Sequence, residues 1–589
     1  MCGIAGVYFN QKKKKKELEI IVSKMVQQQV NRGPDDSGIF IDAKNNIAFG
    51  HNRLAIIDLS KSGHQPMKFG DLWITFNGEI YNFLELKKGL EKKGYKFKTK
   101  TDTEVILALY SAYGEKSFLM LRGMFAFGLW DGKEKKLFLV KDRYGIKPLY
   151  YFSDNEKLIF ASTVKTLAES GLVPLKKNPD AMLGFLLFGS VPLPMTTIQN
   201  ILAVPAGHYL VLEQGNRKKL VEYYNPLAFF ENKKEIEFYE AQKNVRNILE
   251  ESLNLHLISD APLGIFLSGG LDSSAIAALA AKNREKPITT LSVIFDEPEF
   301  SEQEYQRAVA KKIKSDHREI KITAKDFNDS LEEIFKTMDQ PTIDGINTFF
   351  IAKAAKKAGL KTVLSGLGAD EIFLGYPHFK KAELMRRIQK FPEILKLPLK
   401  LGAFFGGRYS KLSYFIDNDI LSFYLGLRGL FSPQETAKIL GIDLKDVQDF
   451  LQKFYDSFFA SNNASFNALH PVNLLSFLEM KLYLQNQLLK DTDFMSMHHS
   501  VEVRVPFLDH PLVEYLSSLS PKLKLSNDVS KPLLVDSVRN LLPAEILSRK
   551  KMGFTFPFQK WLSSDVKGQM LNIKTHWSRY WAKVILEKF

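Results

Sequence analysis

The sequence predicts two domains of different fold class, an α+β domain followed by an α/β domain. Before about residue 215, short segments of alternating apolar residues are typical of antiparallel strands. From about residue 239, strand-like and helix-like segments alternate, as they do in a parallel sheet wrapped by helices. The length of 589 residues also favours more than one domain. We therefore predict domains at residues 1–215 and 239–589, joined by a linker at 216–238.

Individual elements follow from the same patterns. In the first domain, alternation predicts strands at Leu72–Phe76, Met124–Trp130, Leu137–Val140, Leu149–Phe152 and Leu158–Ala161, and helical spacing predicts helices at Phe83–Leu90 and Glu104–Tyr113. In the second domain the expected order is Ala241–Ile258 (helix), Leu263–Leu267 (strand), Ser273–Ala281 (helix), Thr289–Phe295 (strand), Glu302–Ile313 and Thr348–Ala358 (helices) and Thr362–Leu364 (strand). After Gly375 we expect mostly helices.

Composition excludes several classes of protein. One cysteine allows neither an intrachain disulfide nor a thiolate metal cluster, which fits a reducing cytoplasm. No apolar run reaches the roughly 18 residues of a membrane span, so no membrane partner is expected. The net charge of +15 permits contact with polyanions. However, the densest basic run, Lys12–Lys16, contains no aromatic residue and is predicted to be a solvated loop, and we expect no nucleic-acid partner.

The single cysteine, Cys2, is a candidate nucleophile. Removal of Met1 would leave a thiol and a free α-amine on the same residue. An α-amine titrates near ~7.7–8.0 and a thiol near ~8.5, so the amine can accept the thiol proton directly or through a water. The simpler alternative is a stray cysteine near a frayed terminus.

Four polar, glycine-containing segments support the catalytic interpretation: Asn31–Asp35, His51–Leu54, Phe76–Asn82 and Thr101–Glu104. Taken singly, each has a structural explanation as a turn or a surface charge. Together with Cys2 they supply what amide cleavage needs. Asn77 and the Gly78 N–H can stabilise an oxyanion. Arg53 suits a substrate carboxylate, whereas Asp102 and Glu79 suit an ammonium group.

These segments resemble the class II glutamine amidotransferase domain, an N-terminal-nucleophile hydrolase that begins Met-Cys-Gly-Ile and carries Arg-Gly-Pro-Asp and Asn-Gly-Glu-Ile-Tyr-Asn motifs. The resemblance implies stacked antiparallel sheets with helices, Cys2 as the nucleophile, and Asn77 and Gly78 as the oxyanion hole. It also implies glutamine contacts at Arg53, Asn77, Gly78, Glu79 and Asp102. The chain departs from the family pattern at Asn31, where many members have histidine.

A second candidate site follows a buried strand. The segment Phe266–Ser274 reads Phe-Leu-Ser-Gly-Gly-Leu-Asp-Ser-Ser and opens a helix, whose N-terminus offers N–H donors to a phosphate. It is neither a Walker A loop nor a dinucleotide fingerprint. Another cluster, Leu364–Glu371, also ends a strand, and ligands of parallel sheets bind at the carboxyl ends of strands. Both clusters can therefore face one nucleotide, although a simple capped turn is the structural alternative.

The Phe266–Ser274 segment resembles the pyrophosphate loop of the ATP pyrophosphatases, which cleave ATP between the α- and β-phosphates. The resemblance makes Asp272 a candidate Mg²⁺ ligand, with Asp370 as the second carboxylate. The two halves in this order resemble the asparagine synthetase family, which also has sequences like Val501–Asp509 and Ser530–Leu534. That family implies ATP contacts at Leu267, Ser268, Gly269, Gly270, Asp272, Ser273, Val293, Ser365, Gly366 and Lys531.

The expected reaction is glutamine-dependent amide synthesis. Glutamine hydrolysis at Cys2 supplies ammonia, which attacks an acyl-adenylate made from ATP and a carboxylate, with aspartate as the expected acceptor and asparagine as the product. A homodimer is compatible with the family. One alternative is an amidotransferase of the same architecture that acts on a sugar-acid or peptide carboxylate. Another alternative is a tRNA-modifying adenylase. The complete glutamine site argues against it.

Leu367 leaves the identity of the acceptor carboxylate undecided. The segment reads Ser-Gly-Leu-Gly, whereas many family members have glutamate in place of the leucine. In those members the glutamate is thought to accept a proton when ammonia attacks the acyl-adenylate. Leucine cannot do so. Either another base acts, with Glu371 as a candidate, or the acceptor is not aspartate.

Overall fold

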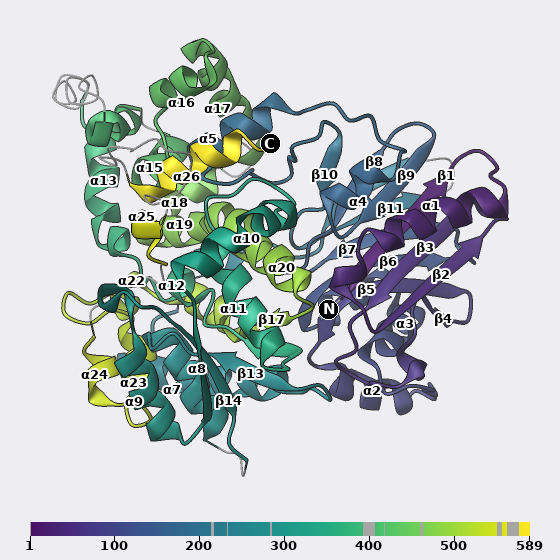
Figure 1. Cartoon of the computed structure of the whole chain (residues 1–589), viewed down its shortest axis with the longest axis horizontal. Coiled ribbons are helices and arrows are strands. Elements are labelled where there is room, and N and C mark those ends of the chain that lie inside the picture. The colour runs from purple at the N-terminus through teal and green to yellow at the C-terminus, as the bar shows by residue number, and fades with distance from the viewer. Residues whose placement is uncertain are drawn as a thin grey trace.

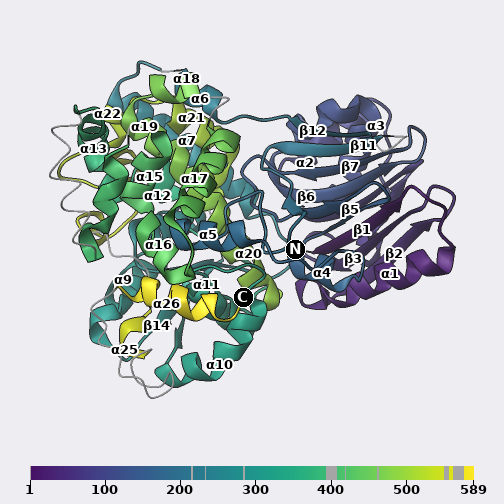
Figure 2. The same cartoon turned by 90° about the horizontal axis from the view of Figure 1, so that it is seen from above.

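The computed structural model describes residues 2–213, 217–232, 234–282, 286–392, 407–417, 419–459, 463–549, 556–561 and 576–589. The first part of the chain forms two six-stranded antiparallel sheets, and the second forms a five-stranded parallel sheet among many helices (Figures 1 and 2). This confirms the predicted fold class of an α+β domain followed by an α/β domain.

The two antiparallel sheets are built from twelve strands. The first has the order β10-β8-β9-β1-β3-β2, with β1 (Gly3–Phe9), β2 (Asp36–Asp42), β3 (Ile47–Arg53), β8 (Tyr150–Ser153), β9 (Lys157–Ala161) and β10 (Ile201–Ala203). The second has the order β12-β11-β7-β6-β5-β4, with β4 (Met67–Phe69), β5 (Leu72–Ile80), β6 (Gly123–Asp131), β7 (Lys136–Lys141), β11 (His208–Glu213) and β12 (Arg217–Glu222).

The first domain has four layers, with a helical layer outside each sheet (Figure 2). Alternate strand residues point between the sheets and form one core, which includes Ile4, Phe49, Trp130, Leu139 and Phe160. The opposite faces are covered by α1 (Lys15–Gln27) and α4 (Val164–Glu169) on the first sheet, and by α2 (Phe83–Glu91) and α3 (Asp102–Tyr113) on the second. Burial on both faces explains why these strands are so rich in apolar residues.

Two details of the first domain differ from expectation. Lys15 and Lys16 begin α1, so the basic run is only partly a loop, although most of it is solvent-exposed as predicted. The amphipathic pattern that starts at Leu18 extends the helix back into the lysines. In addition, β12 lies within the predicted linker and pairs along β11. The proposed domain boundaries stay predictions.

The parallel sheet of the second domain has the order β15-β14-β13-β16-β17. Its strands are β13 (Leu263–Phe266), β14 (Thr289–Ile294), β15 (Asp316–Lys321), β16 (Thr362–Leu364) and β17 (Glu502–Arg504). β17 is not among the predicted elements, since mostly helices are expected after Gly375. Three residues are too few for a periodic signal, and β17 pairs with β16, which lies 138 residues earlier (502 minus 364).

Helices account for most of the rest of the described chain, and several of them pack against this sheet. Those of the described residues after α4 are α5 (Pro179–Phe188), α6 (Leu227–Glu231), α7 (Phe238–His256), α8 (Leu271–Ala281), α9 (Gln303–Ile313), α10 (Ala324–Thr337), α11 (Ile346–Lys357), α12 (Ala369–Ile372), α13 (Ala382–Gln389), α15 (Ile420–Arg428), α16 (Pro433–Leu440), α17 (Leu444–Phe458), α18 (Asn463–Ala468), α19 (Pro471–Leu478), α20 (Leu489–His498), α21 (His510–Ser518), α22 (Pro521–Lys524), α23 (Pro532–Val538), α24 (Ala544–Leu547), α25 (Phe558–Trp561) and α26 (Trp577–Leu586). None of these described helices has the length and apolar composition needed to cross a bilayer.

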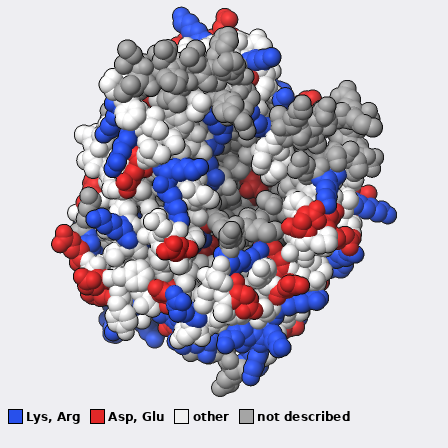
Figure 3. All heavy atoms as spheres, turned by 90° about the vertical axis from the view of Figure 1, so that its left-hand side faces the viewer, with Lys and Arg blue, Asp and Glu red and all other residues white. Residues whose placement is uncertain are grey.

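Ion pairs between buried or partly buried side chains join the two domains. Arg32 contacts Asp493 at 2.8 Å, and Arg122 donates to Asp509 from its Nε at 2.9 Å. The start of β1 lies at this junction in both views (Figures 1 and 2). On the face drawn in Figure 3, Lys and Arg are interspersed with Asp and Glu, so the described side chains there form no surface of one charge.

Candidate active sites

Cys2 lies immediately before β1, close to the second domain. Its side chain is buried, and burial raises the pKa of the thiol above its ordinary value, so the thiol needs a base to become a nucleophile. Its backbone nitrogen donates to Asn77 Oδ1 at 2.9 Å, and its carbonyl oxygen accepts from Arg32 Nε at 3.1 Å. The Cys2 backbone is therefore held from both sides.

Asn77 is the best-placed oxyanion donor. It is fully buried in β5, and its Nδ2 has no hydrogen-bond partner among the described residues, although its Oδ1 is bound to the Cys2 backbone. A buried N–H without a partner costs about 1–3 kcal/mol, and an oxyanion would satisfy it. At Gly78, φ is +155°, and a Cβ would lie 2.1 Å from the Met124 carbonyl oxygen, so only glycine fits there.

Arg53 ends β3, and its guanidinium is held by backbone carbonyls. It donates to the oxygen of Ser60 at 2.8 Å and also to that of Asp58. A Cβ at Gly63 would lie 2.0 Å from Arg53 Nη2, which explains the glycine in this loop. A preorganised guanidinium is suited to bind a planar carboxylate.

The two predicted ammonium ligands are both buried. Glu79, in β5, has its Oε2 without a hydrogen-bond partner among the described residues, and burial raises its pKa, with a further contribution from repulsion by Glu502. Asp102, in the first turn of α3, accepts from the Ile80 N–H at 2.9 Å, and burial raises its pKa to about 6. Two buried carboxyl groups whose pKa values are raised by burial suit a cationic ligand group.

Arg504 was missed by sequence reasoning as a neighbour of this site. It lies in β17 of the second domain, yet its Nη2 is 3.6 Å from Glu79 Oε1, and its Nε donates to Glu502 at 2.6 Å. Its Nη1 donates to the carbonyl oxygens of His256 and Ile258. Val501–Asp509 was recognised only as a family sequence. No local pattern shows that this arginine reaches the first domain.

The second candidate site is a cavity of about 550 Å³ at the carboxyl ends of the parallel strands. It is lined by Leu267, Ser268, Gly270, Asp272, Ser273, Val293, Ser365, Gly366, Asp370 and Lys531, among others. The structure thus brings together both clusters and Lys531, nine of the ten predicted ATP contacts and both predicted metal ligands. The exception is Gly269, which does not line the cavity. Its carbonyl oxygen accepts from Arg549 Nη1 at 3.0 Å, so it faces the arginine.

The serine hydroxyls of the loop bind one another. Ser268 Oγ and Ser273 Oγ are 2.9 Å apart, and Ser273 Oγ also contacts the Ser268 nitrogen and the Gly270 carbonyl oxygen. These bonds hold the loop at the N-terminus of α8, where a phosphate would be stabilised by the helix. Arg549, which also lines the cavity, was not predicted. It forms an ion pair with Glu302 at 2.5 Å.

Lys531 connects the two predicted metal ligands. Its Nζ is 2.5 Å from Asp272 Oδ2 and 2.6 Å from Asp370 Oδ1, and its side chain is 4% exposed. The two carboxylates raise its pKa against the opposing effect of burial. A Cβ at Gly375 would lie 2.1 Å from Asp370 and 2.2 Å from Lys531 Cε, so glycine is needed beside this cluster. A cation thus already occupies the space between the carboxylates.

A buried acid lies four residues after Leu367, which itself lines the cavity. Glu371 is 1% exposed, and Tyr376 donates its hydroxyl to Glu371 Oε1 at 2.7 Å. Burial raises the pKa of Glu371 to about 7, assisted by repulsion from Asp370. A carboxyl group that titrates near neutral pH is suited to general acid–base catalysis.

The two sites define a class of enzyme, an amidotransferase that joins an amide-cleaving domain to a nucleotide-dependent synthetase domain. Residues 1–224 match the glutamine amidotransferase domain model, and residues 244–580 match the asparagine synthase model. The chain belongs to the glutamine-hydrolysing asparagine synthetase family.

Relatives extend along almost the whole chain. It is 33% identical to "Asparagine synthetase [glutamine-hydrolyzing] 1" of Bacillus subtilis, over 97% of this chain and 90% of that protein. It is 30% identical to "Asparagine synthetase [glutamine-hydrolyzing] 3" of the same organism, over 94% and 87%. A fungal protein named "Amidase chry2", from Gibberella zeae, is 28% identical over 90% of this chain and 84% of its own length.

Proposed function

We propose that the protein makes asparagine from aspartate, with glutamine as the nitrogen donor and ATP as the activating substrate. The observation that carries this proposal is the unpartnered Asn77 Nδ2 beside Cys2, on a chain that also holds the Asp272–Lys531–Asp370 cluster in a nucleotide-sized cavity. An amide-cleaving site and a carboxylate-activating site on one chain are useful together because ammonia from the first is consumed at the second.

In the first site, the Cys2 thiol attacks the glutamine side-chain amide. The free α-amine left by removal of Met1 accepts the thiol proton, directly or through a water. Asn77 and Gly78 stabilise the oxyanion, and ammonia leaves as a thioester forms, which water then hydrolyses to glutamate. Arg53 binds the glutamine carboxylate, and Glu79 and Asp102 bind its ammonium group. The ammonia passes inside the protein to the cavity.

In the second site, an aspartate carboxylate oxygen attacks the α-phosphorus of ATP, and pyrophosphate leaves. Leu267, Val293, Ser365 and Gly366 line the cavity. We assign ATP to these residues, with Val293 beside the adenine. The loop over Ser268–Ser273 binds the phosphates through its N–H groups and the α8 N-terminus. Ammonia then attacks the acyl-adenylate and AMP leaves.

Mg²⁺ is the proposed metal. Asp272 and Asp370 fit it because both offer hard oxygen ligands and already converge on one cation, the Lys531 ammonium. When bound, Mg²⁺ would neutralise phosphate charge. Lys531 then contacts the leaving pyrophosphate, for which its buried, permanently charged ammonium is suited.

Glu371 is the proposed base for the attack by ammonia. Leu367 cannot accept the proton. Glu371 can, because its pKa is raised to about 7 and its carboxyl group is hydrogen-bonded to Tyr376. The apolar Leu367 in the lining also favours a second candidate function, amide formation on a sugar-acid or peptide carboxylate.

We propose the cytoplasm as the location because one cysteine suits a reducing compartment. A homodimer is the assembly to test.

The deciding experiment supplies glutamine and ATP with a panel of carboxylates and measures pyrophosphate release. Aspartate should stimulate release and yield asparagine and AMP, and Leu367→Glu should leave this activity within about tenfold, because the base lies elsewhere. Stimulation by another carboxylate but not by aspartate would select the second candidate. Formation of ADP and phosphate would refute activation at the α-phosphorus.

A further inference from the structure

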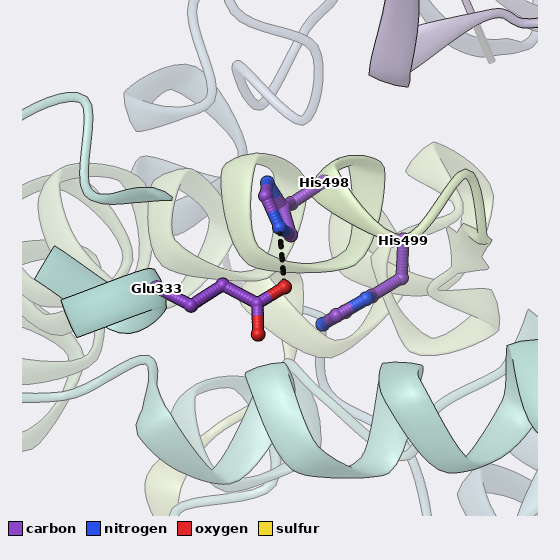
Figure 4. A group of neighbouring side chains, drawn as sticks. All are labelled: Glu333, His498 and His499. Carbon is purple, nitrogen blue, oxygen red and sulfur yellow. Dashed lines mark hydrogen bonds and ion pairs between the residues drawn. The ribbon is translucent and has the colours of Figure 1, made fainter. Parts of the chain in front are cut away.

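Three potential metal ligands meet outside both candidate active sites. Glu333 comes from α10, and His498 and His499 come from the C-terminal end of α20 (Figure 4). One ligand atom from each lies within 4.8 Å of the others. None of the three lines the 550 Å³ cavity. Two imidazoles and one carboxylate form a donor set that Zn²⁺ accepts in proteins.

His499 is the observation that points to a ligand. Its side chain is only 5% exposed, and its Nε2 has no hydrogen-bond partner among the described residues. Figure 4 shows its ring directed toward the carboxylate of Glu333. A buried ring nitrogen without a partner is costly, and coordination would satisfy it.

We propose that Glu333, His498 and His499 bind one divalent transition-metal ion of the zinc type, with water completing the coordination. In a tetrahedral zinc site with bonds near 2.0–2.1 Å, ligand atoms lie about 3.3 Å apart. His498 Nε2 and Glu333 Oε1 are 2.9 Å apart, already near this separation. The gap to His499 can close by rotation of the Glu333 side chain, which is 41% exposed.

Lys353 opposes metal binding and therefore offers a test. Its Nζ is 3.4 Å from Glu333 Oε2 and 3.2 Å from Ser330 Oγ. A positive charge so close to the carboxylate competes with a metal ion for it. Removal of this lysine should tighten metal binding, whereas a His–Glu ion pair with no metal function predicts no such gain.

The position of the cluster gives the metal a structural role. The residue after His499, Ser500, donates its hydroxyl to the Asn31 carbonyl oxygen at 2.7 Å, next to Arg32, which contacts Cys2. A metal ion bound between α10 and α20 would fix the end of α20 where it meets the first domain. The proposal does not depend on the acceptor or on the reaction.

The test is calorimetric titration of the chelator-treated full-length protein with ZnCl₂, together with its melting temperature. We expect one site per chain with a Kd of about 10 μM or tighter and a rise in Tm. Glu333→Gln, which changes an exposed side chain, and His499→Gln should each weaken binding at least about tenfold. Lys353→Met should strengthen it about threefold or more.

Two control variants test whether other side chains of the protein bind the zinc instead. His64 forms a comparable pair with Asp36 at 2.7 Å but has no third ligand nearby among the described residues, so His64→Ala should bind zinc as the wild type does. Cys2→Ala should also retain the site, which excludes the thiol as the ligand. Absence of stoichiometric binding at 100 μM zinc (about tenfold above the expected Kd), or equal affinity in Glu333→Gln, would overturn the proposal.

Discussion

Replacement of Asn77 by alanine tests the proposed oxyanion hole directly. The substitution removes the unpartnered Nδ2 donor and also the Oδ1 that accepts from the Cys2 nitrogen at 2.9 Å. Loss of one oxyanion donor costs about 10²–10³ in kcat, which is about 2.7–4 kcal/mol of transition-state stabilisation. Loss of the bond to Cys2 adds about 1 kcal/mol of positioning. We therefore expect glutamine hydrolysis to fall by at least about 10²-fold.

The assay is glutamate release from glutamine, compared with amide synthesis from added ammonium. Synthesis from ammonium should persist because the cavity does not use Asn77. Asn77→Asp is an isosteric second variant. It keeps an acceptor for the Cys2 nitrogen but loses the Nδ2 donor, so its kcat should fall as much as that of Asn77→Ala.

Asn82→Ala is the matched control. Asn82 belongs to the same Asn77–Asn82 segment, but its side chain donates to the Met120 carbonyl oxygen and accepts from the Arg122 N–H. Its loss should lower stability by about 1 kcal/mol and leave kcat near the wild-type value. If Asn77→Ala retains glutaminase kcat within about fivefold, or falls no further than Asn82→Ala, the oxyanion role is wrong.

Four further predictions follow from the two sites. Cys2→Ala should abolish glutamine hydrolysis and glutamine-dependent synthesis but preserve ammonium-dependent synthesis; retained hydrolysis would exclude Cys2 as the nucleophile. Because Asp102 must be ionised to bind an ammonium group and its pKa is raised to about 6, kcat/KM for glutamine should decline as the pH falls through 6. A pH profile that is unchanged in Asp102→Asn would assign this decline to another group. Lys531→Met should lower pyrophosphate release by about 10²–10³ while glutaminase activity persists. Asp272→Asn and Asp370→Asn should each weaken the Mg²⁺ dependence of that release, and unchanged Mg²⁺ titrations would refute the metal assignment.

Much of the fold was predictable because its signals are local. The strand predicted at Leu137–Val140 is present within β7, and the glycine-rich turn after β13 does open α8. Apolar periodicity within a few residues decides whether a segment can bury one face, whatever lies elsewhere in the chain. β17 escaped prediction because three residues carry no period, and its partner β16 is distant in sequence.

Residue type and spacing identify the chemical groups of both sites, whereas the packing of distant segments sets which of these groups meet. Residue type and spacing indicate the chemistry of Cys2, of the Asn77-Gly78 pair and of the serine-rich loop. The approach of Arg504 to Glu79, the insertion of Lys531 between two carboxylates, and the meeting of Glu333 with His499 were not visible there. Each joins residues more than 140 positions apart, and such contacts arise only when sheets and helices pack, because packing rather than local propensity sets which side chains face each other.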